Sequence, residues 1–214
     1  METIPPAADG RETDSAGLRR LTRSVFAASA VALLLVAAVA FGALHLGDAV
    51  RSYVKGESLW SKGQKEAVIA LQAYARYGQE SRWEEYRDAI SIPLGDRRAR
   101  RALEAEPPDL QDARQGFRQG GLEQGEIDGM IRLFRWFRDW GPMRRSIRIW
   151  SRGDSLITEL REEADRIRRE WQSPPPDSAV LVDAVARIEG LNEELSREER
   201  AFTSSIATAA DRAM

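Results

Sequence analysis

The sequence predicts an all-α protein, with one N-terminal transmembrane helix followed by a four-helix-type bundle that carries short accessory helices. Three observations support this fold class. Residues 24–47 contain no charged side chain. Beyond position 50, apolar residues recur at spacings of three and four, which is the period of an amphipathic helix. Proline and glycine pairs separate the periodic segments at 107–108, 120–121 and 141–142.

The uncharged segment has the length of a membrane-spanning helix. It is SVFAASAVALLLVAAVAFGALHLG, which is 24 residues of mainly Ala, Val, Leu and Phe. Roughly 20 apolar residues are enough to cross the hydrocarbon core. The alternative is a cleaved signal peptide, whose apolar region is about 7–15 residues long and which would be cut after Ala38-Val39-Ala40. The length of the segment and the polar stretch before it favour an uncleaved signal anchor.

The charges on either side of this segment predict its orientation. Three arginines stand just before it, whereas the two basic residues after it are offset by Asp48. Because basic residues concentrate in cytoplasmic loops, we expect a cytoplasmic N-terminus and a bacterial inner-membrane protein. Residues 1–23 are then a disordered cytoplasmic tail, and residues 48–214 form a periplasmic, extracytoplasmic domain. The basic residues before and after the segment are Arg19, Arg20, Arg23, Arg51 and Lys55.

Small residues four apart within the segment indicate that two copies can pack closely. The pairs are Ala28 with Ala32 and Ala38 with Gly42. Such spacing lets two membrane helices approach each other, so we expect a homodimer.

The chain after the membrane segment divides into several expected helices. One extends to Gly78, and a short amphipathic turn follows at 83–90. Pro93 is expected to restart the chain into a brief helix that ends before Pro107. Asp109 is a good N-cap for the next ten residues. Longer helices are expected over 123–140 and up to 172.

The last helix, from about 178 to the end of the printed sequence, has the most regular pattern. Its apolar residues recur every seven positions, which is typical of one helix of a bundle or coiled coil. These residues are Leu181, Ile188, Leu195, Phe202 and Ala209.

No catalytic, cofactor-binding or metal-binding set is visible, so we expect a protein that is not an enzyme and has no cofactor. The chain has no cysteine, and His45 is its single histidine. A single histidine cannot form a histidine cluster for zinc, and because His45 lies at the edge of the expected membrane segment we expect no Ser-His-Asp triad. Asp154 lies in an otherwise apolar stripe, and we expect an arginine of a facing helix to pair with it.

Residues 131–150 contain six arginines and three tryptophans against one acid. The arginines fall on the polar sides of two amphipathic helices, so a solvated face paired with nearby acids explains them. A formal net charge of −2 and the expected compartment argue against nucleic acid. Converging guanidiniums could instead hold a small anionic ligand, stacked on an indole. The candidate residues for that site are Arg132, Arg135, Arg138, Arg144, Arg145 and Trp136.

Four features between residues 57 and 169 are distinctive: Trp60, IPLGDRRAR at 92–100, IDGMI at 127–131 and IWSRGDSLI at 149–157. Through them this part of the chain resembles the extracytoplasmic regions that precede GGDEF/EAL modules or histidine kinases in bacterial membrane-bound signalling proteins. The resemblance implies a helical sensor placed after a first membrane span.

We therefore expect the sensory input region of a two-component or cyclic-di-GMP signalling protein, non-catalytic and with an unknown ligand. The alternative is a stand-alone single-pass envelope scaffold that binds another envelope protein through an exposed helix face.

Overall fold

The computed structural model describes the backbone of residues 11–173 and 175–213. It describes the side chains of residues 29, 31–36, 51–141, 143–173, 175–205 and 207–208. The chain divides into two compact units, Met1–Leu46 and Gly47–Met214. All secondary structure in the described residues is helical, which confirms the predicted all-α class.

The N-terminal unit consists of the first part of helix α1 (Arg11–Tyr77). The helix begins at Arg11, within the stretch predicted to be disordered, because extending an existing helix needs no new nucleus. No helix of adequate length is apolar enough to cross a membrane, as far as the described residues go. Most side chains of residues 24–47 lie outside the described residues, so the transmembrane segment stays a prediction.

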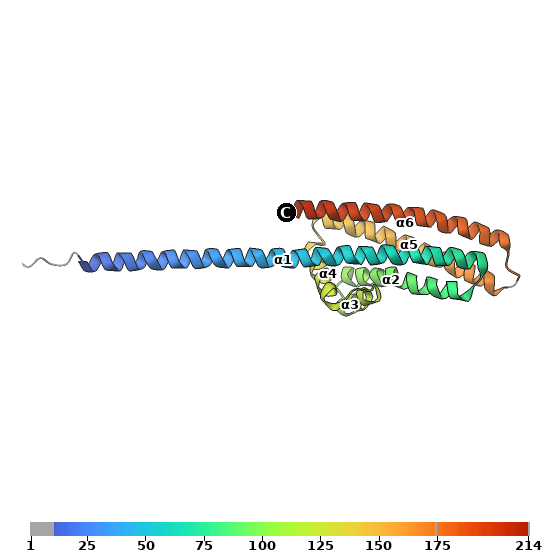
Figure 1. Cartoon of the computed structure of the whole chain (residues 1–214), viewed down its shortest axis with the longest axis horizontal. Coiled ribbons are helices and arrows are strands. Elements are labelled where there is room, and N and C mark those ends of the chain that lie inside the picture. The colour runs from blue at the N-terminus through green and yellow to red at the C-terminus, as the bar shows by residue number, and fades with distance from the viewer. Residues whose placement is uncertain (1–10, 174, 214) are drawn as a thin grey trace, which may run out of the picture. The chain divides into compact units, whose positions relative to one another are not determined.

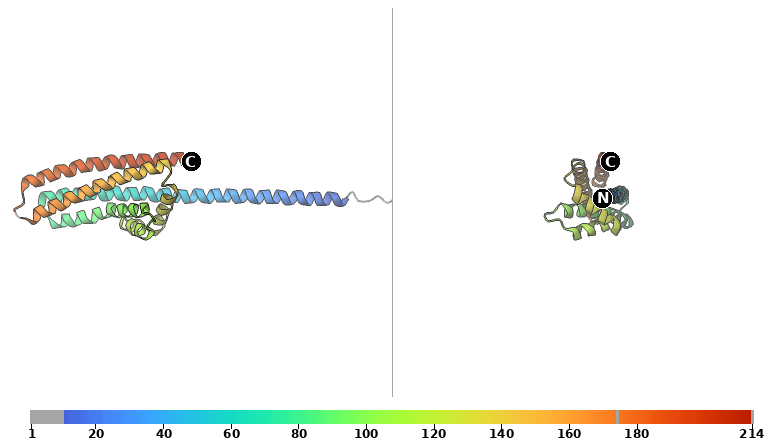
Figure 2. Two further views of the ribbon diagram at one scale, coloured as in Figure 1. Left: turned by 180° about the vertical axis from the view of Figure 1, so that it is seen from behind. Right: turned by 90° about the vertical axis from the view of Figure 1, so that its left-hand side faces the viewer.

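The second unit is a helical bundle. It is built from α1, α2 (Glu80–Glu104), α5 (Gly141–Gln172) and α6 (Ser178–Ala213). Two shorter helices, α3 (Leu110–Gln119) and α4 (Gln124–Phe137), lie at one end of the bundle. The turns from α1 to α2 and from α5 to α6 lie at the opposite end, as Figures 1 and 2 show. The last turn of α6 therefore lies at the same end as α3 and α4.

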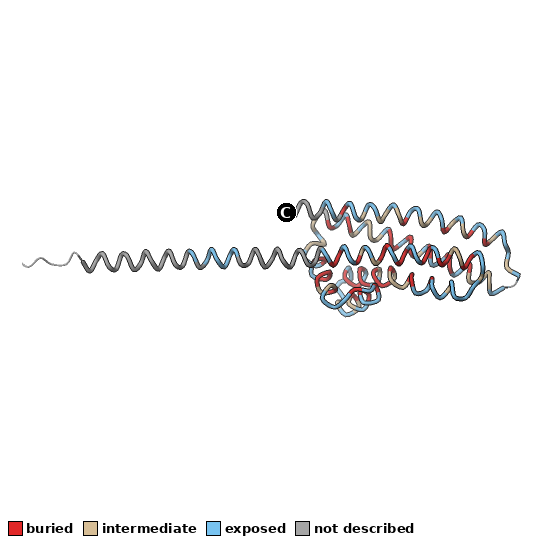
Figure 3. Tube along the Cα trace, viewed as in Figure 1, coloured by how far each residue is buried: buried red, intermediate tan, exposed pale blue. Residues whose placement is uncertain are grey.

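The core of the bundle runs along the inward faces of these four long helices, coloured red in Figure 3. The heptad positions Leu181, Ile188 and Leu195 of α6 are buried, as predicted, whereas Phe202 is only partly buried. Ala209 lies outside the residues whose side chains are described. The largest fully buried side chains of the bundle core include Leu71, Tyr74, Tyr86, Ile157, Leu160 and Ile167.

The expected break at Pro93 is wrong, because α2 runs unbroken from Glu80 to Glu104 with Pro93 inside it. A proline within a helix leaves the carbonyl four residues earlier without its usual donor, here that of Ala89. That carbonyl oxygen lies 3.0 Å from the Cβ position of Gly63 in α1. Close packing of α1 on this part of α2 stabilises a helix that local sequence disfavours.

The accessory helices begin where the sequence predicts and press closely on α2. Asp109 accepts hydrogen bonds from the backbone N–H groups of Gln111 and Asp112, at 3.0 and 2.9 Å. A Cβ added at Gly95 of α2 would lie 2.6 Å from the carbonyl oxygen of Gly116 in α3. The two backbones therefore touch, and a side chain at either glycine would push α3 away from the bundle.

Gly78 lies at the end of the bundle that holds the turns from α1 to α2 and from α5 to α6, called the closed end below. This residue has φ +62°, and an added Cβ would lie 2.7 Å from the Trp171 ring. We expect Gly78→Ala to destabilise the bundle by about 1–2 kcal/mol or more, because an L-residue is strained there and the indole must also move. Gly190→Ala, on α6 with nothing within 4 Å, is the matched control and should stabilise by about 0.5–1 kcal/mol. Denaturant unfolding followed by circular dichroism measures both, and equal effects of the two substitutions would contradict the account.

Candidate functional site

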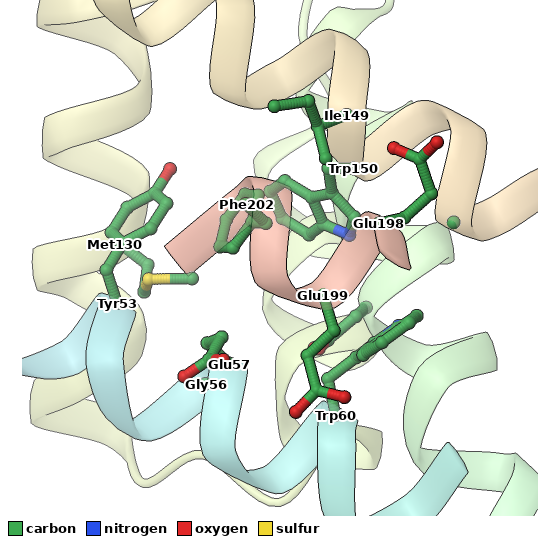
Figure 4. Close-up of a pocket in the computed structure, with 12 residues that line it drawn as sticks. Tyr53, Gly56, Glu57, Trp60, Met130, Ile149, Trp150, Glu198, Glu199 and Phe202 are labelled. Carbon is green, nitrogen blue, oxygen red and sulfur yellow. The ribbon is translucent and has the colours of Figure 1, made fainter. Parts of the chain in front are cut away.

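A cavity lies between the bundle helices at the end that carries α3 and α4. Helices α1, α2, α4, α5 and α6 all contribute to its walls. Its free space for the centre of a water-sized molecule is about 40 Å³, which is more than one water needs. Figure 4 shows side chains of α4, α5 and α6 converging on the α1 residues. The cavity is lined by Tyr53, Gly56, Glu57, Trp60, Asp96, Met130, Ile149, Trp150, Gly153, Glu198, Glu199 and Phe202.

Aromatic side chains from three helices form much of the wall. The rings of Trp150 on α5 and Phe202 on α6 meet edge to face, with centroids 6.4 Å apart. Two glycines leave room beside this surface. The Cβ position of Gly153 lies 3.3 Å from the Trp60 ring, and that of Gly56 lies 3.5 Å from Met130 Cε. Larger residues at these two glycines would fill the space.

Three buried polar atoms of the cavity residues find no hydrogen-bond partner among the described residues. They are Tyr53 Oη, Trp60 Nε1 and Asp96 Oδ1. The side chains that carry them are 4%, 9% and 5% exposed. Leaving a buried polar group unpaired costs about 1–3 kcal/mol. Four such atoms of the described residues also lie outside the cavity residues, so the unpaired atoms alone do not mark a ligand site. What the cavity shares with small-molecule sites is its apolar wall.

Two buried acidic side chains at this end of the bundle, Asp154 and Asp96, differ in whether a basic side chain pairs with them. Arg100 Nε donates to Asp154 Oδ2 at 2.6 Å, and Arg100 also pairs with Glu104. The predicted arginine partner of Asp154 is therefore confirmed. Burial raises the pKa of Asp154 to about 6, although Arg100 acts against this rise.

Asp96, by contrast, has no hydrogen bond or ion pair with a described residue. Burial raises the pKa of Asp96 well above its ordinary value, and the charge of Asp154 raises it further. Burial also raises the pKa of Tyr53, with a smaller contribution from Asp96. A carboxyl group in this position is poorly solvated and lacks a counter-charge.

Polar contacts link α1 to α6 through Glu57 and Glu199, two of the residues that line the cavity. Ser61 Oγ and Lys65 Nζ donate to Glu199 at 2.5 and 2.9 Å. Thr203 Oγ1 donates to Glu57 at 2.9 Å. The two helices that line the cavity are thus held together at its rim by hydrogen bonds and a salt bridge.

The arginines predicted to hold an anion lie elsewhere. Arg132, Arg135, Arg144 and Arg145 are exposed, and Arg138 is half-buried beside Asp139, at 3.7 Å. Trp136 is 71% exposed. None of these six residues lines the cavity. The anion site stays a prediction.

Sequence reasoning missed the cavity residues Tyr53, Asp96 and Phe202 as a set. A signal for Asp96 was present, because it lies between Gly95 and Ala99 on the face of α2 that is buried. A charged residue on such a face needs a partner or a function. Pairing across five helices, however, cannot be deduced from the spacing within any one of them.

No protein-family model matches the chain, and neither a curated protein nor a solved structure is similar to it. The resemblance to sensor regions therefore stays a prediction.

The raised pKa of Asp96 predicts how stability changes with pH. A carboxyl whose folded-state pKa is raised binds more protons in the folded chain, so it favours folding at low pH. Its contribution should fall by about 1.4 kcal/mol per pH unit above about pH 4, until the folded-state pKa is reached. In Asp96→Asn this loss is absent, so the variant should become more stable than the wild type as the pH rises.

Asp88→Asn, on the exposed side of the same helix, is the matched control and should leave the pH profile unchanged. Free energies of unfolding measured from pH 4 to 8 make the comparison. Parallel profiles for the wild type and Asp96→Asn would contradict the buried, unpaired state of Asp96.

Proposed function

We propose that this chain is the non-catalytic, ligand-binding input region of a membrane-anchored signalling protein, of the two-component or cyclic-di-GMP type. The observation that carries the proposal is the cavity, which five helices line with mainly apolar and aromatic side chains. Unfilled space inside a bundle lowers its stability, so a cavity kept at the meeting point of five helices is consistent with a ligand role.

The position of the cavity along the chain supports a signalling role. Its α1 residues begin at Tyr53, shortly after the apolar segment that ends at Gly47. Its α6 residues, Glu198 to Phe202, belong to the last helix. A ligand that touches both helices favours the packing to which it binds more tightly, and that difference in affinity is the signal.

The end of α6 is suited to such a change. Up to Leu195, buried apolar residues hold α6 in the core. From Ser196 to Ser205 the only fully buried described side chain is Ser205, whose hydroxyl pairs with that of Ser146 at 2.8 Å. Hydrogen bonds and the packing of Phe202 on Trp150 hold this part of α6, which buries less apolar surface than the part up to Leu195. We infer that it can shift at a smaller energetic cost than the rest of the helix.

The rest of the proposal comes from the sequence. Residues 24–47 anchor the chain in the bacterial inner membrane, the N-terminus is cytoplasmic, and the bundle lies in the periplasm. The chain forms a homodimer through small residues of the membrane segment.

A second candidate is a single-pass envelope scaffold. The observation that favours it is Trp136 on α4, which is 71% exposed, directly follows Arg135 and lies one helical turn after Arg132. Exposed tryptophan beside arginine is typical of protein-binding surfaces. An anionic ligand or an envelope protein would bind the same surface. We call this surface the arginine strip; it comprises Arg132, Arg135, Trp136, Arg138, Arg144 and Arg145.

A thermal-shift experiment distinguishes the two sites. Small molecules dialysed from the source cells are added to the full chain in detergent, and the melting temperature is measured. A ligand in the cavity should raise it, since a molecule that binds only the folded state stabilises it. Gly56→Leu, which fills the cavity, should abolish the shift. Gly125→Leu, where an added side chain meets nothing within 4 Å, should retain it.

Loss of the shift in Arg135→Ala or Arg145→Ala, with Gly56→Leu unaffected, would move the site to the arginine strip. Absence of any shift in the wild type would contradict a small-molecule input role.

A further inference from the structure

We propose that the arginine strip binds anionic lipid head groups at the surface of the membrane that anchors the chain. This inference rests on the membrane anchor of the proposed function and goes beyond it, because it gives the bundle a second attachment to the bilayer. In this arrangement the tryptophan of the strip lies among the head groups, and its arginines pair with lipid phosphates.

Helices α1 and α5 run parallel, and their contacts show how far along the bundle the strip lies. At each of three contacts the α5 residue comes about 93 positions after its partner in α1 or in the turn that follows α1. The same register places residues 141–145, the first turn of α5, level with residues 48–52 of α1. The contacting pairs are Trp60 with Gly153, Tyr74 with Arg168, and Gly78 with Trp171.

Helix α6 supports the same register. Ser146 of α5 pairs with Ser205 of α6 at 2.8 Å. Thr203, on the same part of α6, donates to Glu57 of α1 at 2.9 Å. The first turns of α5 therefore lie level with the part of α1 that begins the bundle unit, Gly47–Met214.

Helix α4 carries the remaining residues of the strip at the same end of the bundle, as Figures 1 and 2 show. Lys55 of α1 pairs with Glu126 of α4 at 2.7 Å, which fixes α4 beside this part of α1. The buried face of α4, which includes Phe134, packs toward the bundle, so Arg135 and Trp136 point outward.

The membrane segment predicted from the sequence ends at Gly47, directly before the α1 residues that lie level with the strip. An α-helix rises 1.5 Å per residue, so residues 48–52 lie within about 8 Å of that point along the helix. The head-group region on each side of the hydrocarbon core is roughly 5–8 Å thick. The strip therefore lies at the depth of the lipid head groups.

The described side chains of the membrane segment support its contact with lipid. Residue 31 and residues 33–36 are large and apolar, and they are 57–70% exposed. Successive residues point to different sides of a helix, so this apolar surface runs around the whole helix. A helix that is apolar on every side is typical of a protein interior or a membrane, and the exposure of these side chains favours the membrane.

The positive charge of the strip is not balanced by acids. The strip contains five arginines, and Asp139 is the one acidic residue in the sequence from 131 to 150. Arg138 lies 3.7 Å from Asp139. The other four arginines are exposed, and none forms an ion pair with an acidic residue that the structure describes. Exposed guanidiniums bind phosphate oxygens bidentately, and a bilayer surface presents many phosphates in one plane.

Trp136 gives the strip a second property of surfaces that meet a bilayer. Its side chain is 71% exposed. The half-buried rings of Phe137 and Trp140 meet edge to face nearby, with centroids 6.1 Å apart. Tryptophan is enriched at membrane–water interfaces, where its ring meets apolar chains and its N–H contacts polar groups. An exposed indole among arginines at head-group depth therefore favours a lipid partner.

The experiment uses the full chain in nanodiscs of phosphatidylcholine, with or without the anionic lipid phosphatidylglycerol. Lipids that carry bromine in the upper part of their acyl chains quench nearby tryptophans, and the difference between the wild type and Trp136→Phe isolates the Trp136 signal. We expect quenching of Trp136 to be at least twofold stronger in the anionic discs. High salt should reduce this difference, because it screens exposed charges.

Paired substitutions test the arginines. Arg135→Gln with Arg144→Gln should weaken docking on the anionic discs at least tenfold, which would remove most of the extra quenching. Arg135→Lys with Arg144→Lys keeps the charge and should retain most of it. Arg82→Gln with Arg87→Gln, exposed at the closed end, removes the same charge and should change nothing. Equal effects of the two glutamine pairs would overturn the inference.

Two further outcomes contradict the proposal and point to other partners. If Trp136 is quenched equally in both kinds of disc, or in neither, the strip does not dock on anionic lipid and a protein is the better partner. If soluble glycerol 3-phosphate changes the Trp136 fluorescence in neutral discs, beyond the effect of sodium chloride at equal ionic strength, the strip is a site for free anions.

The failure of this inference can be told apart from that of the proposed function. Extraction of cell membranes with alkaline carbonate tests the anchor directly. If the chain resists extraction and the discs show no dependence on anionic lipid, lipid docking is wrong and the anchor stands. If carbonate removes the chain, the anchor is wrong and docking beside it fails as well. The thermal-shift experiment tests the ligand-binding function separately.

Discussion

The buried ion pair between Arg100 of α2 and Asp154 of α5 is the constraint on which this end of the bundle depends. The Arg100 guanidinium pairs with two acidic side chains, Asp154 and Glu104. Removing one member of a buried pair typically costs about 3–5 kcal/mol, so this contact fixes α2 against α5. Asp96, on the same helix, is buried, and its Oδ1 has no hydrogen-bond partner among the described residues.

The two ends of the bundle are built differently. At the closed end Arg168 binds Glu80 through both guanidinium nitrogens, donates to Tyr74 at 2.8 Å, and lies 5.1 Å from the centre of the Trp83 ring. At the cavity end, polar contacts hold α6 to α1. Large side chains and charge-assisted bonds join α1, α2 and α5 at the first end, whereas polar contacts join α1 and α6 at the second. The proposed shift of α6 on ligand binding concerns the second end.

Local physical rules predicted much of the fold. The N-cap at Asp109, the heptad stripe around Leu195 and the arginine partner of Asp154 all follow from short-range patterns. Pro93 did not, because packing of α1 against α2 overrides local helix propensity. The segments 92–100 and 149–157, noted for their resemblance, contain Asp96, Trp150 and Gly153 of the cavity. The two segments can be recognised in the sequence. Their position beside Tyr53 and Phe202 depends on tertiary packing, which the spacing of apolar residues within one helix does not predict.

The central claim is that ligand in the cavity changes how α6 packs on the rest of the bundle. The most direct measurement is the distance between nitroxide labels at Arg101 on α2 and Thr208 on α6, both of which are exposed. The chain has no native cysteine, so two engineered cysteines label uniquely. Double electron–electron resonance measures this distance on the full chain with and without saturating ligand. We expect two populations of distances, whose proportions change when the ligand is added. Identical distributions under demonstrated saturation would contradict the claim.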